Sequence, residues 1–142
     1  PPPAVTNAQI QGTLTSLSGA WGAAPAFNGN FEFYVNLSTG AIFNATMAGS
    51  GVDGGGFTQN FLVQNGSGSA AAGTFNIGSF TGQITHAISP TFNIISTDNT
   101  TLSGSIDYSA VGRPTSGNYN ISADSTGWAN MDNGTAAGSR TQ

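Results

Sequence analysis

The stretch FNGNFEFYVNLSTGAIFNATM, residues 27–47, decides the fold class of this chain. Apolar and polar residues alternate up to the Ser38-Thr39-Gly40 segment, and the alternation resumes after it. Alternation with a period of two is typical of a half-buried β-strand, and a short Gly-containing segment between two such runs predicts a hairpin. We expect one face of this hairpin to be buried, with Phe31, Phe33, Val35 and Leu37 from the first strand and Ala41, Phe43, Ala45 and Met47 from the second.

The same alternation recurs from Ala8 to Ala123, and helical periodicity is nearly absent. The Gly-rich segments 49–56 and 65–73 are predicted as loops. Strands at about 8–12-residue spacing with such turns favour a sandwich or an antiparallel barrel. We therefore predict an all-β fold: a single antiparallel β-sandwich or barrel of about nine strands, with an extended Pro-rich N-terminus and an irregular C-terminal tail.

A chain of 142 residues suits one domain, which we divide into three parts. Residues 1–15 are an extended N-terminal segment and a first strand. Residues 16–123 are the β-sandwich or barrel core. Residues 124–142 are the C-terminal tail, which lacks an apolar pattern apart from Trp128 and Met131.

The charge composition excludes several classes of partner. Charged residues make up 6 %, against roughly 25 % in an ordinary soluble domain, and the only Lys or Arg residues are Arg113 and Arg140. Nucleic-acid binding needs a basic surface, so a pI near 4.2 argues against it, and also against binding to anionic membrane surfaces. No apolar run approaches the roughly 18 residues that would predict a membrane-spanning helix.

The absence of Cys excludes disulfides and thiolate metal sites. The chain starts at Pro1-Pro2-Pro3 without Met, from which we expect a mature form after signal-peptide removal. A surface without Lys and rich in Ser, Thr, Asn and Gly is typical of proteins outside the cell. We predict an extracellular or cell-surface location.

No catalytic, cofactor or metal motif is recognisable. His86 is the only histidine, and it is either a general base or metal ligand or, as we favour, a strand-end side chain with one satisfied ring nitrogen. The stretch 124–134 contains Asp, Asn and Gly but lacks the spacing of a calcium loop. Three of the six carboxylates, Asp53, Asp98 and Asp132, lie in Gly/Asn contexts where turn chemistry explains them. We predict that the protein is not an enzyme and binds no cofactor.

Three aromatic residues, Trp21, Tyr34 and Trp128, occur in an Asn-rich sequence and are candidates for stacking against a glycan. Exposed aromatic rings beside amide groups are what carbohydrate-binding modules use. The alternative, which we favour, is that Trp21 covers one end of the core and Trp128 anchors the tail.

The order FNGNFEFYVNLSTGAIFNATMAGSG, GTFNIGSFTGQI and LSGSIDYSAVGRPTSGNYNIS extends over roughly residues 27–123. It resembles the small β-barrels of the transferrin-binding-protein-like and FecR-associated bacterial surface proteins. In place of the Phe-Tyr-Gly-Pro type of closing turn, this chain has Asp107-Tyr108-Ser109-Ala110. The resemblance implies a surface-exposed barrel that binds a host protein, a small ligand or a glycan, and it assigns no binding residues.

Two functions follow from these observations. Charges keep proteins apart and protect sheet edges from pairing with other chains, and this chain has few charges. A neutral polar β-surface therefore favours an extracellular structural protein, a subunit of a filament, sheath or surface assembly whose partners are other copies of itself. The alternative is the secreted or cell-surface binding module that the resemblance implies.

The first strand is our predicted subunit interface. A terminal strand can leave its own domain and complete the sheet of a neighbour, as in donor-strand exchange. The alternative is that this strand pairs within its own domain. The residues predicted to make the contact share one face of the strand: Ala8, Ile10, Gly12 and Leu14.

Overall fold

The computed structural model describes residues 5–16, 27–52, 58–86, 89–94, 100–121 and 131–142. These residues form ten β-strands, and none of them is helical. Pro1-Pro2-Pro3, predicted to be extended, lies outside the described residues. The strands are β1 (Asn7–Ser16), β2 (Phe27–Asn36), β3 (Ala41–Val52), β4 (Thr58–Ala71), β5 (Thr74–Gly78), β6 (Thr81–His86), β7 (Ser89–Ile94), β8 (Thr101–Ile106), β9 (Pro114–Ile121) and β10 (Met131–Arg140).

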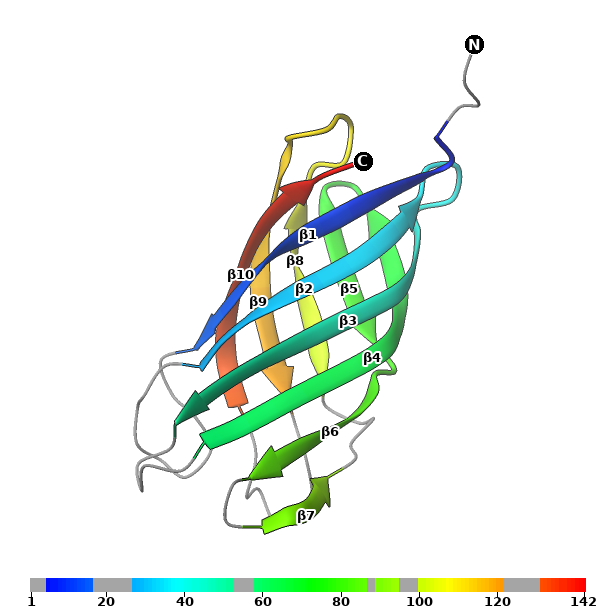
Figure 1. Cartoon of the computed structure of the whole chain (residues 1–142). Helices are drawn as coiled ribbons and strands as arrows, with labels where there is room; N and C mark the ends of the chain where they lie inside the picture. The colour runs from blue at the N-terminus through cyan, green and yellow to red at the C-terminus, as the bar shows by residue number, and fades with distance from the viewer. Residues whose placement is uncertain (1–4, 17–26, 53–57, 87–88, 95–99, 122–130) are drawn as a thin grey trace.

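Eight of the strands close into an antiparallel barrel (Figure 1). The hairpins β1–β2, β2–β3 and β3–β4 are followed by β4–β5, β5–β8, β8–β9 and β9–β10, and β10 pairs with β1 to close the ring. β5 and β6 lie end to end along β4, and β7 pairs with β6. The predicted all-β antiparallel fold is confirmed, and of the two architectures considered it is the barrel.

The barrel interior is filled by alternate side chains of the strands. An eight-stranded barrel is just wide enough for its side chains to fill it. The aromatic rings pack against one another there: the centroids of Phe33 and Phe75 are 5.4 Å apart, and those of Phe61 and Tyr119 are 6.5 Å apart. Among the described residues, the largest fully buried side chains are Tyr119, Phe33, Phe80, Ile10, Leu14, Met47, Ile77 and Leu102.

Glycines on neighbouring strands make room for these rings. At four of the glycines that the structure describes, a Cβ atom would lie less than 3.0 Å from an aromatic ring atom, which real Cβ atoms essentially never do. Each of these glycines is therefore covered by a ring, an arrangement that compensates a strand for the missing side chain. The pairs are Gly12 with Phe31, Gly49 with Phe61, Gly66 with Phe80, and Gly134 with Tyr119.

A β-bulge in β3 corrects one prediction for the opening hairpin. Asn44 has a φ of 52°, and the β2–β3 register shifts next to it. The extra residue changes which side chains face inward, because a one-residue slip moves a strand's alternation to the other face. Ala45 and Met47 are buried as predicted, but Ile42 is buried in place of Phe43, which lies half-buried on the outer face.

The turn that follows β2 corrects a second face assignment. Leu37 was predicted on the buried face, but it lies in the tight turn to β3 and is exposed. Ala41, at the start of β3, is exposed as well. In this turn the backbone N–H groups of Ser38 and Thr39 donate to the Asn36 side-chain oxygen. The turn chemistry ends the alternation one residue earlier than the apolar pattern indicates.

Three segments predicted to be irregular are strands, wholly or in part. β4 continues to Ala71, and the chain turns only at Ala72-Gly73, both with positive φ. β3 extends to Val52. The C-terminal tail was predicted to be irregular, but residues 131–140 form β10. Its buried positions include Gly134 and Ala136, which are too small to give an apolar pattern. At Gly134 the ring of Tyr119 from β9 fills the space that a side chain would occupy.

None of the described segments forms a helix that is both long and apolar enough to cross a membrane.

Candidate functional site

The first strand, predicted as a subunit interface, lies within its own barrel. Ala8, Ile10 and Leu14 are buried in the interior, and Gly12 is covered by Phe31. β1 is bonded along one edge to β2 and along the other to β10. This is the second of the two alternatives, pairing within the same domain. In this arrangement both edges of the strand are occupied.

Of the three aromatic residues considered for glycan stacking, Tyr34 is described. It lies on the outer face of β2, between the buried residues Phe33 and Val35. Trp21 and Trp128 lie outside the described residues. The backbone of His86 ends β6, and its side chain lies outside what the structure describes.

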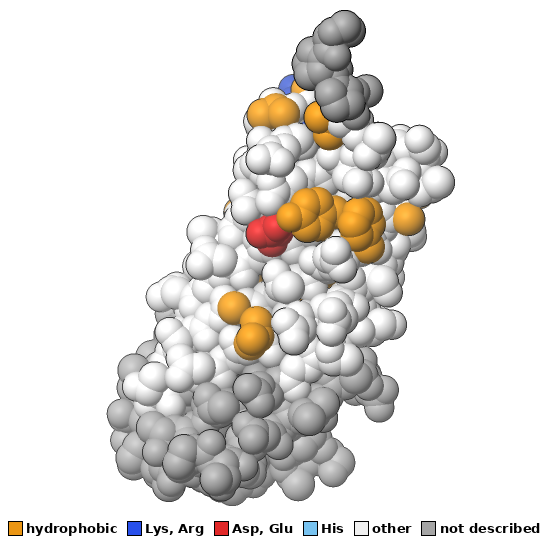
Figure 2. Space-filling view, turned by 45° about the vertical axis from the view of Figure 1, so that its right-hand side comes forward, with side chains coloured by type: hydrophobic (Ala, Val, Ile, Leu, Met, Phe, Trp, Pro, Cys, Tyr) orange, Lys and Arg blue, Asp and Glu red, His pale blue; other side chains and the backbone are white. Residues whose placement is uncertain are grey.

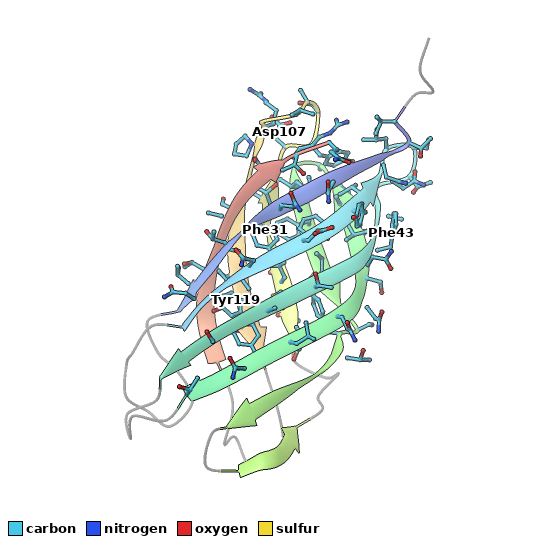
Figure 3. The ribbon with its side chains drawn as sticks, in the orientation of Figure 1. Phe31, Phe43, Asp107 and Tyr119 are labelled. Carbon is cyan, nitrogen blue, oxygen red and sulfur yellow. The ribbon has the colours of Figure 1, made fainter. Side chains whose placement is uncertain are left out.

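Tyr34 belongs to a group of five outward-facing side chains that we call the Glu32 cluster: Gln9, Gln11, Glu32, Tyr34 and Phe43. The β1–β2 register places Gln9 opposite Tyr34 and Gln11 opposite Glu32. The β2–β3 register places Phe43 opposite Tyr34. Directly opposed residues are close enough for their side chains to interact. The register of three adjacent strands therefore assembles the cluster on one wall of the barrel. Of its members, Phe43 is labelled in Figure 3.

The Glu32 carboxylate is held by three neutral donors. The Tyr34 hydroxyl donates to Oε1 at 2.6 Å, Gln9 Nε2 donates to Oε1 at 3.0 Å, and Gln11 Nε2 donates to Oε2 at 3.2 Å. The Tyr34 hydrogen bond, followed by those of Gln9 and Gln11, lowers the pKa of Glu32. The same bond to Glu32 raises the pKa of Tyr34. The lowered pKa keeps Glu32 ionised at neutral pH. Because the three donors are neutral, none of them offsets its negative charge.

The aromatic half of the cluster is a stacked pair. The ring centroids of Tyr34 and Phe43 are 5.6 Å apart and the ring planes are 22° from parallel. Both side chains are only half-buried, so part of each ring faces solvent. In the space-filling view the acidic group on this wall lies directly beside the broadest hydrophobic patch, and most of the surrounding surface is neutral and polar (Figure 2). The cluster combines a flat apolar surface with a fixed acceptor.

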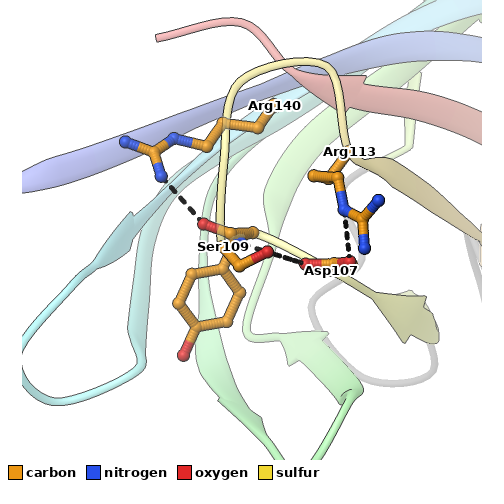
Figure 4. Close-up of polar contacts among 5 residues, drawn as sticks. Asp107, Ser109, Arg113 and Arg140 are labelled. Atoms are coloured by element: carbon orange, nitrogen blue, oxygen red, sulfur yellow. Dashed lines mark hydrogen bonds and ion pairs between the residues drawn. The ribbon is translucent and has the colours of Figure 1, made fainter.

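The second distinctive region is the end of the barrel that carries the β2–β3, β4–β5 and β8–β9 turns, which we call the turn end. Arg113 Nε donates to Asp107 Oδ2 at 2.8 Å, and Arg140 Nη1 donates to the Tyr108 carbonyl at 2.9 Å (Figure 4). The hydroxyl and backbone N–H of Ser109 and then Arg113 lower the pKa of Asp107. A shallow depression of about 450 Å³ lies here, lined by Gly73, Ile106, Asp107, Tyr108 and Ser109.

Within the described ranges, no group of three or more His, Asp or Glu side chains is close enough to hold a metal ion. Comparison of the chain with family models, with curated proteins and with solved structures finds no match. The resemblance to the transferrin-binding-protein-like and FecR-associated barrels therefore stays a prediction.

The sequence pattern gave Tyr34 as a candidate and missed its neighbours. Glu32 and Tyr34 share the polar face of one strand, a signal visible in the alternation. Gln9 and Gln11 join them only through the β1–β2 register, which the alternation alone does not set. The alternation predicts Phe43 in the core, because nothing in the pattern of apolar residues indicates the bulge at Asn44.

Proposed function

We propose that this chain is an extracellular, non-enzymatic binding module that holds carbohydrate on the outer wall of its barrel, at the Glu32 cluster. The observation that carries the proposal is a solvent-facing Tyr34–Phe43 stack directly beside a carboxylate already oriented by three hydrogen bonds. Binding sites combine apolar surface with a few well-placed polar groups.

The chemistry of the cluster matches that of a sugar ring. A pyranose has an apolar C–H face, which packs on aromatic rings, and hydroxyl groups around its edge. A carboxylate offers about four acceptor positions, and the three donors on Glu32 leave room for one more. Gln9 and Gln11 each offer an amide oxygen as a further acceptor. A sugar stacked on Tyr34 and Phe43 would place its hydroxyls among these groups.

Charge selects among carbohydrates. The formal net charge of the chain is −4, and the depressed pKa of Glu32 keeps this carboxylate ionised. A uronic acid or a sulfated sugar would place a like charge beside Glu32, whereas a neutral sugar or an amino sugar would not. We therefore expect neutral and amino-sugar polymers to bind and acidic polymers not to bind.

The structural-subunit function is the second candidate. Donor-strand exchange would require β1 to leave both β2 and β10, and a closed barrel has no free edge within its ring. For this reason we propose the binding module ahead of the structural subunit. What favours a self-assembling subunit is the turn end, where the exposed apolar residues Val5, Leu37 and Val111 lie.

Affinity electrophoresis tests the binding function. The wild-type chain is run through gels containing a neutral glucan, a chitosan or a polyuronate, beside Phe43→Ser and Leu62→Ser. Leu62 is the matched control, because it is an exposed apolar residue on the wall of β4, outside the cluster. An aromatic contact contributes about 0.5–1.5 kcal/mol, so Phe43→Ser should weaken binding to the polymer by about two- to tenfold.

Two results would count against carbohydrate binding at this site. One is equal mobility of the wild-type chain in gels with and without each polymer. The other is an equal loss of retardation in Leu62→Ser and Phe43→Ser, which would mean that the wall binds without using the cluster. Circular dichroism of each variant checks that the β-structure is retained.

A further inference from the structure

Two adjacent residues of β4, Asn65 and Gly66, lie where this strand changes its partner. Along one edge, β4 pairs with β6 as far as Gln64 and with β5 from Ser67 onwards. Along the other edge, the register with β3 shifts on both sides of the pair that Ala45 makes with Gly66. Among the described strands, Asn65 therefore has no directly opposed residue on either edge of β4.

The barrel restricts the residue type at both of these positions. Asn65 has a φ of 60°, a left-handed conformation that Gly and Asn adopt more readily than other residues. The ring of Phe80 covers Gly66, where a Cβ atom would lie less than 3.0 Å from three ring atoms. A side chain at position 66 would therefore collide with the core. Together, these two local requirements favour the dipeptide Asn-Gly.

An Asn-Gly dipeptide carries its own chemistry. Glycine has no side chain to shield its backbone nitrogen and rotates freely, so this nitrogen can reach the preceding side-chain amide. When Gly66 N attacks Cγ of Asn65, a C–N bond forms and the side-chain nitrogen leaves as ammonia, which gives a cyclic succinimide. Water then opens the ring at one of its two carbonyls, and aspartate or isoaspartate results. The sequence consumes one water, releases one ammonia and needs no oxidant.

The surroundings of Asn65 leave its amide open to this reaction. The side chain is exposed, so the water that opens the ring has access to it. Its Nδ2 donates to Thr81 Oγ1 at 3.1 Å, a side-chain hydrogen bond that is also exposed. Such a bond exchanges readily with water and contributes little net free energy. The position is therefore held mainly by its backbone, which lacks an opposed partner.

The chain contains a matched comparison at Asn28-Gly29. This dipeptide is identical and Asn28 is also exposed, but its φ is not positive. Asn28 lies opposite Thr15 on β1 and opposite Ser50 on β3, and Gly29 is likewise paired on both sides. Ring closure requires the backbone around the asparagine to rotate. At this position it must first leave two ladders, which is a local opening with its own free-energy cost.

We propose that Asn65-Gly66 is a site of spontaneous covalent modification, at which the folded chain converts Asn65 to aspartate or isoaspartate. Each conversion adds one negative charge, so the formal net charge goes from −4 to −4 − 1 = −5. Aspartate keeps the length of the backbone and can accept a hydrogen bond from Thr81. Isoaspartate adds one carbon atom to the main chain, which shifts Gly66 relative to the ring of Phe80. The site thus changes surface charge and core packing as the molecule ages.

This inference goes beyond carbohydrate binding and does not depend on it. The reaction uses only the chain and water, and none of the Glu32 cluster takes part in it. Failure of one proposal therefore leaves the other unaffected.

Peptide mapping of the folded wild-type chain tests the site. The chain is incubated at mildly alkaline pH and samples are digested with pepsin in acid, where succinimide formation is slow. Mass spectrometry then follows the exchange of NH₂ for OH in the peptides that contain residues 28 and 65. The exchange at Asn65 should be at least about tenfold faster than at Asn28, because the segment around Asn28 must open first. In urea, where the ladders are lost, the two rates should become similar.

Two variants complete the test by ion-exchange chromatography of the intact chain. Asn65→Gly keeps the left-handed conformation without strain, so it should fold normally and lack the reactive amide. Asn65→Asp carries the product side chain and marks where the modified chain elutes. The wild type should accumulate a species at that position with time, and Asn65→Gly should not.

Three results would overturn the proposal. The first is equal rates of exchange at Asn28 and Asn65 in the folded chain. The second is a rate difference of the same size in urea, which would assign it to the flanking sequence instead of the fold. The third is an acidic species that forms as fast in Asn65→Gly as in the wild type.

Discussion

At the scale of single residues, the fold depends on glycines that face aromatic rings. Gly134 is buried in β10, where a Cβ atom would collide with the ring of Tyr119, a fully buried side chain of β9. Neither partner can give way easily, because protein interiors are close-packed. The high glycine content of the chain therefore has a packing role as well as a role in turns.

Replacing Gly134 with Ala should destabilise the barrel by about 1–3 kcal/mol, the usual cost of overpacking. Gly78→Ala is the control, since a Cβ at Gly78 has nothing within 4 Å and its φ is not positive. Urea unfolding should place Gly78→Ala within about 0.5 kcal/mol of the wild type. Equal stability of the two variants would show that the Tyr119 ring has room to move.

Glu32 makes folding stability depend on pH. Its pKa is lowered in the folded state from an ordinary value of 4.5, so its contribution is fully present above pH 4.5 and is lost as the pH falls through the folded pKa. Urea unfolding of wild type and Glu32→Gln should therefore differ most at neutral pH, and the difference should shrink below pH 4.5. A difference that stays constant down to pH 2 would mean that the three hydrogen bonds to Glu32 do not favour its charged form.

At the scale of elements, the bulge in β3 controls which face carries Phe43. Asn44 is exposed and has a φ of 52°, a left-handed conformation that Asn tolerates and β-branched residues do not. The bulge keeps Ile42, Ala45 and Met47 inward while Phe43 joins Tyr34 outside. The proposed binding surface thus depends on the conformation of a residue that need not touch the ligand.

Asn44→Val should cost about 1–2 kcal/mol, because the left-handed conformation is strained for a β-branched side chain. Asn44→Gly should be neutral or slightly stabilising, because Gly adopts this φ without strain. Thermal unfolding of both variants gives the comparison. If Asn44→Val unfolds at the same temperature as the wild type, the left-handed conformation at position 44 does not strain a β-branched residue.

The bulge is one reason why the sequence alone predicts only part of the fold. Alternation predicted β1 and β2 with their buried faces, because Ile10, Leu14 and Phe33 carry large apolar side chains at regular spacing. β10 escaped prediction because its inward positions hold small residues such as Gly134, and the ring that covers Gly134 belongs to Tyr119 of another strand. Gln9 and Gln11 reach Glu32 through strand register, which depends on contacts between segments distant in sequence.

At the scale of the whole molecule, β10 closes the barrel. It pairs with β9 on one side and with β1 on the other. Without it, β1 and β9 would each present a row of unpaired backbone groups, which promotes aggregation. The C-terminal segment, which has almost no apolar pattern, is therefore as necessary to the fold as the Phe-rich hairpin.

Deleting residues 131–142 should abolish the native barrel, with the remaining chain recovered as aggregate or as an unfolded species in circular dichroism. Adding a peptide of residues 131–142 during refolding should restore part of the β-signal, since the peptide can bond to both open edges. A truncated chain that stays monomeric with a wild-type β-spectrum would contradict the role given to β10.

The pairing of β1 with β10 also determines which contacts of the barrel form last during folding. Each hairpin of the barrel joins neighbouring segments, but the β1–β10 pair joins Thr15 to Thr135, 120 residues away. Contacts between such distant residues carry a large loop-closure entropy, so they form late, and chains that depend on them fold slowly. Until β1 pairs with β10, the sheet is open and both of its edge strands carry unpaired backbone N–H and C=O groups. The time a new chain spends in that state, before its two ends meet, is the interval in which a strand from another copy can take the place of its own.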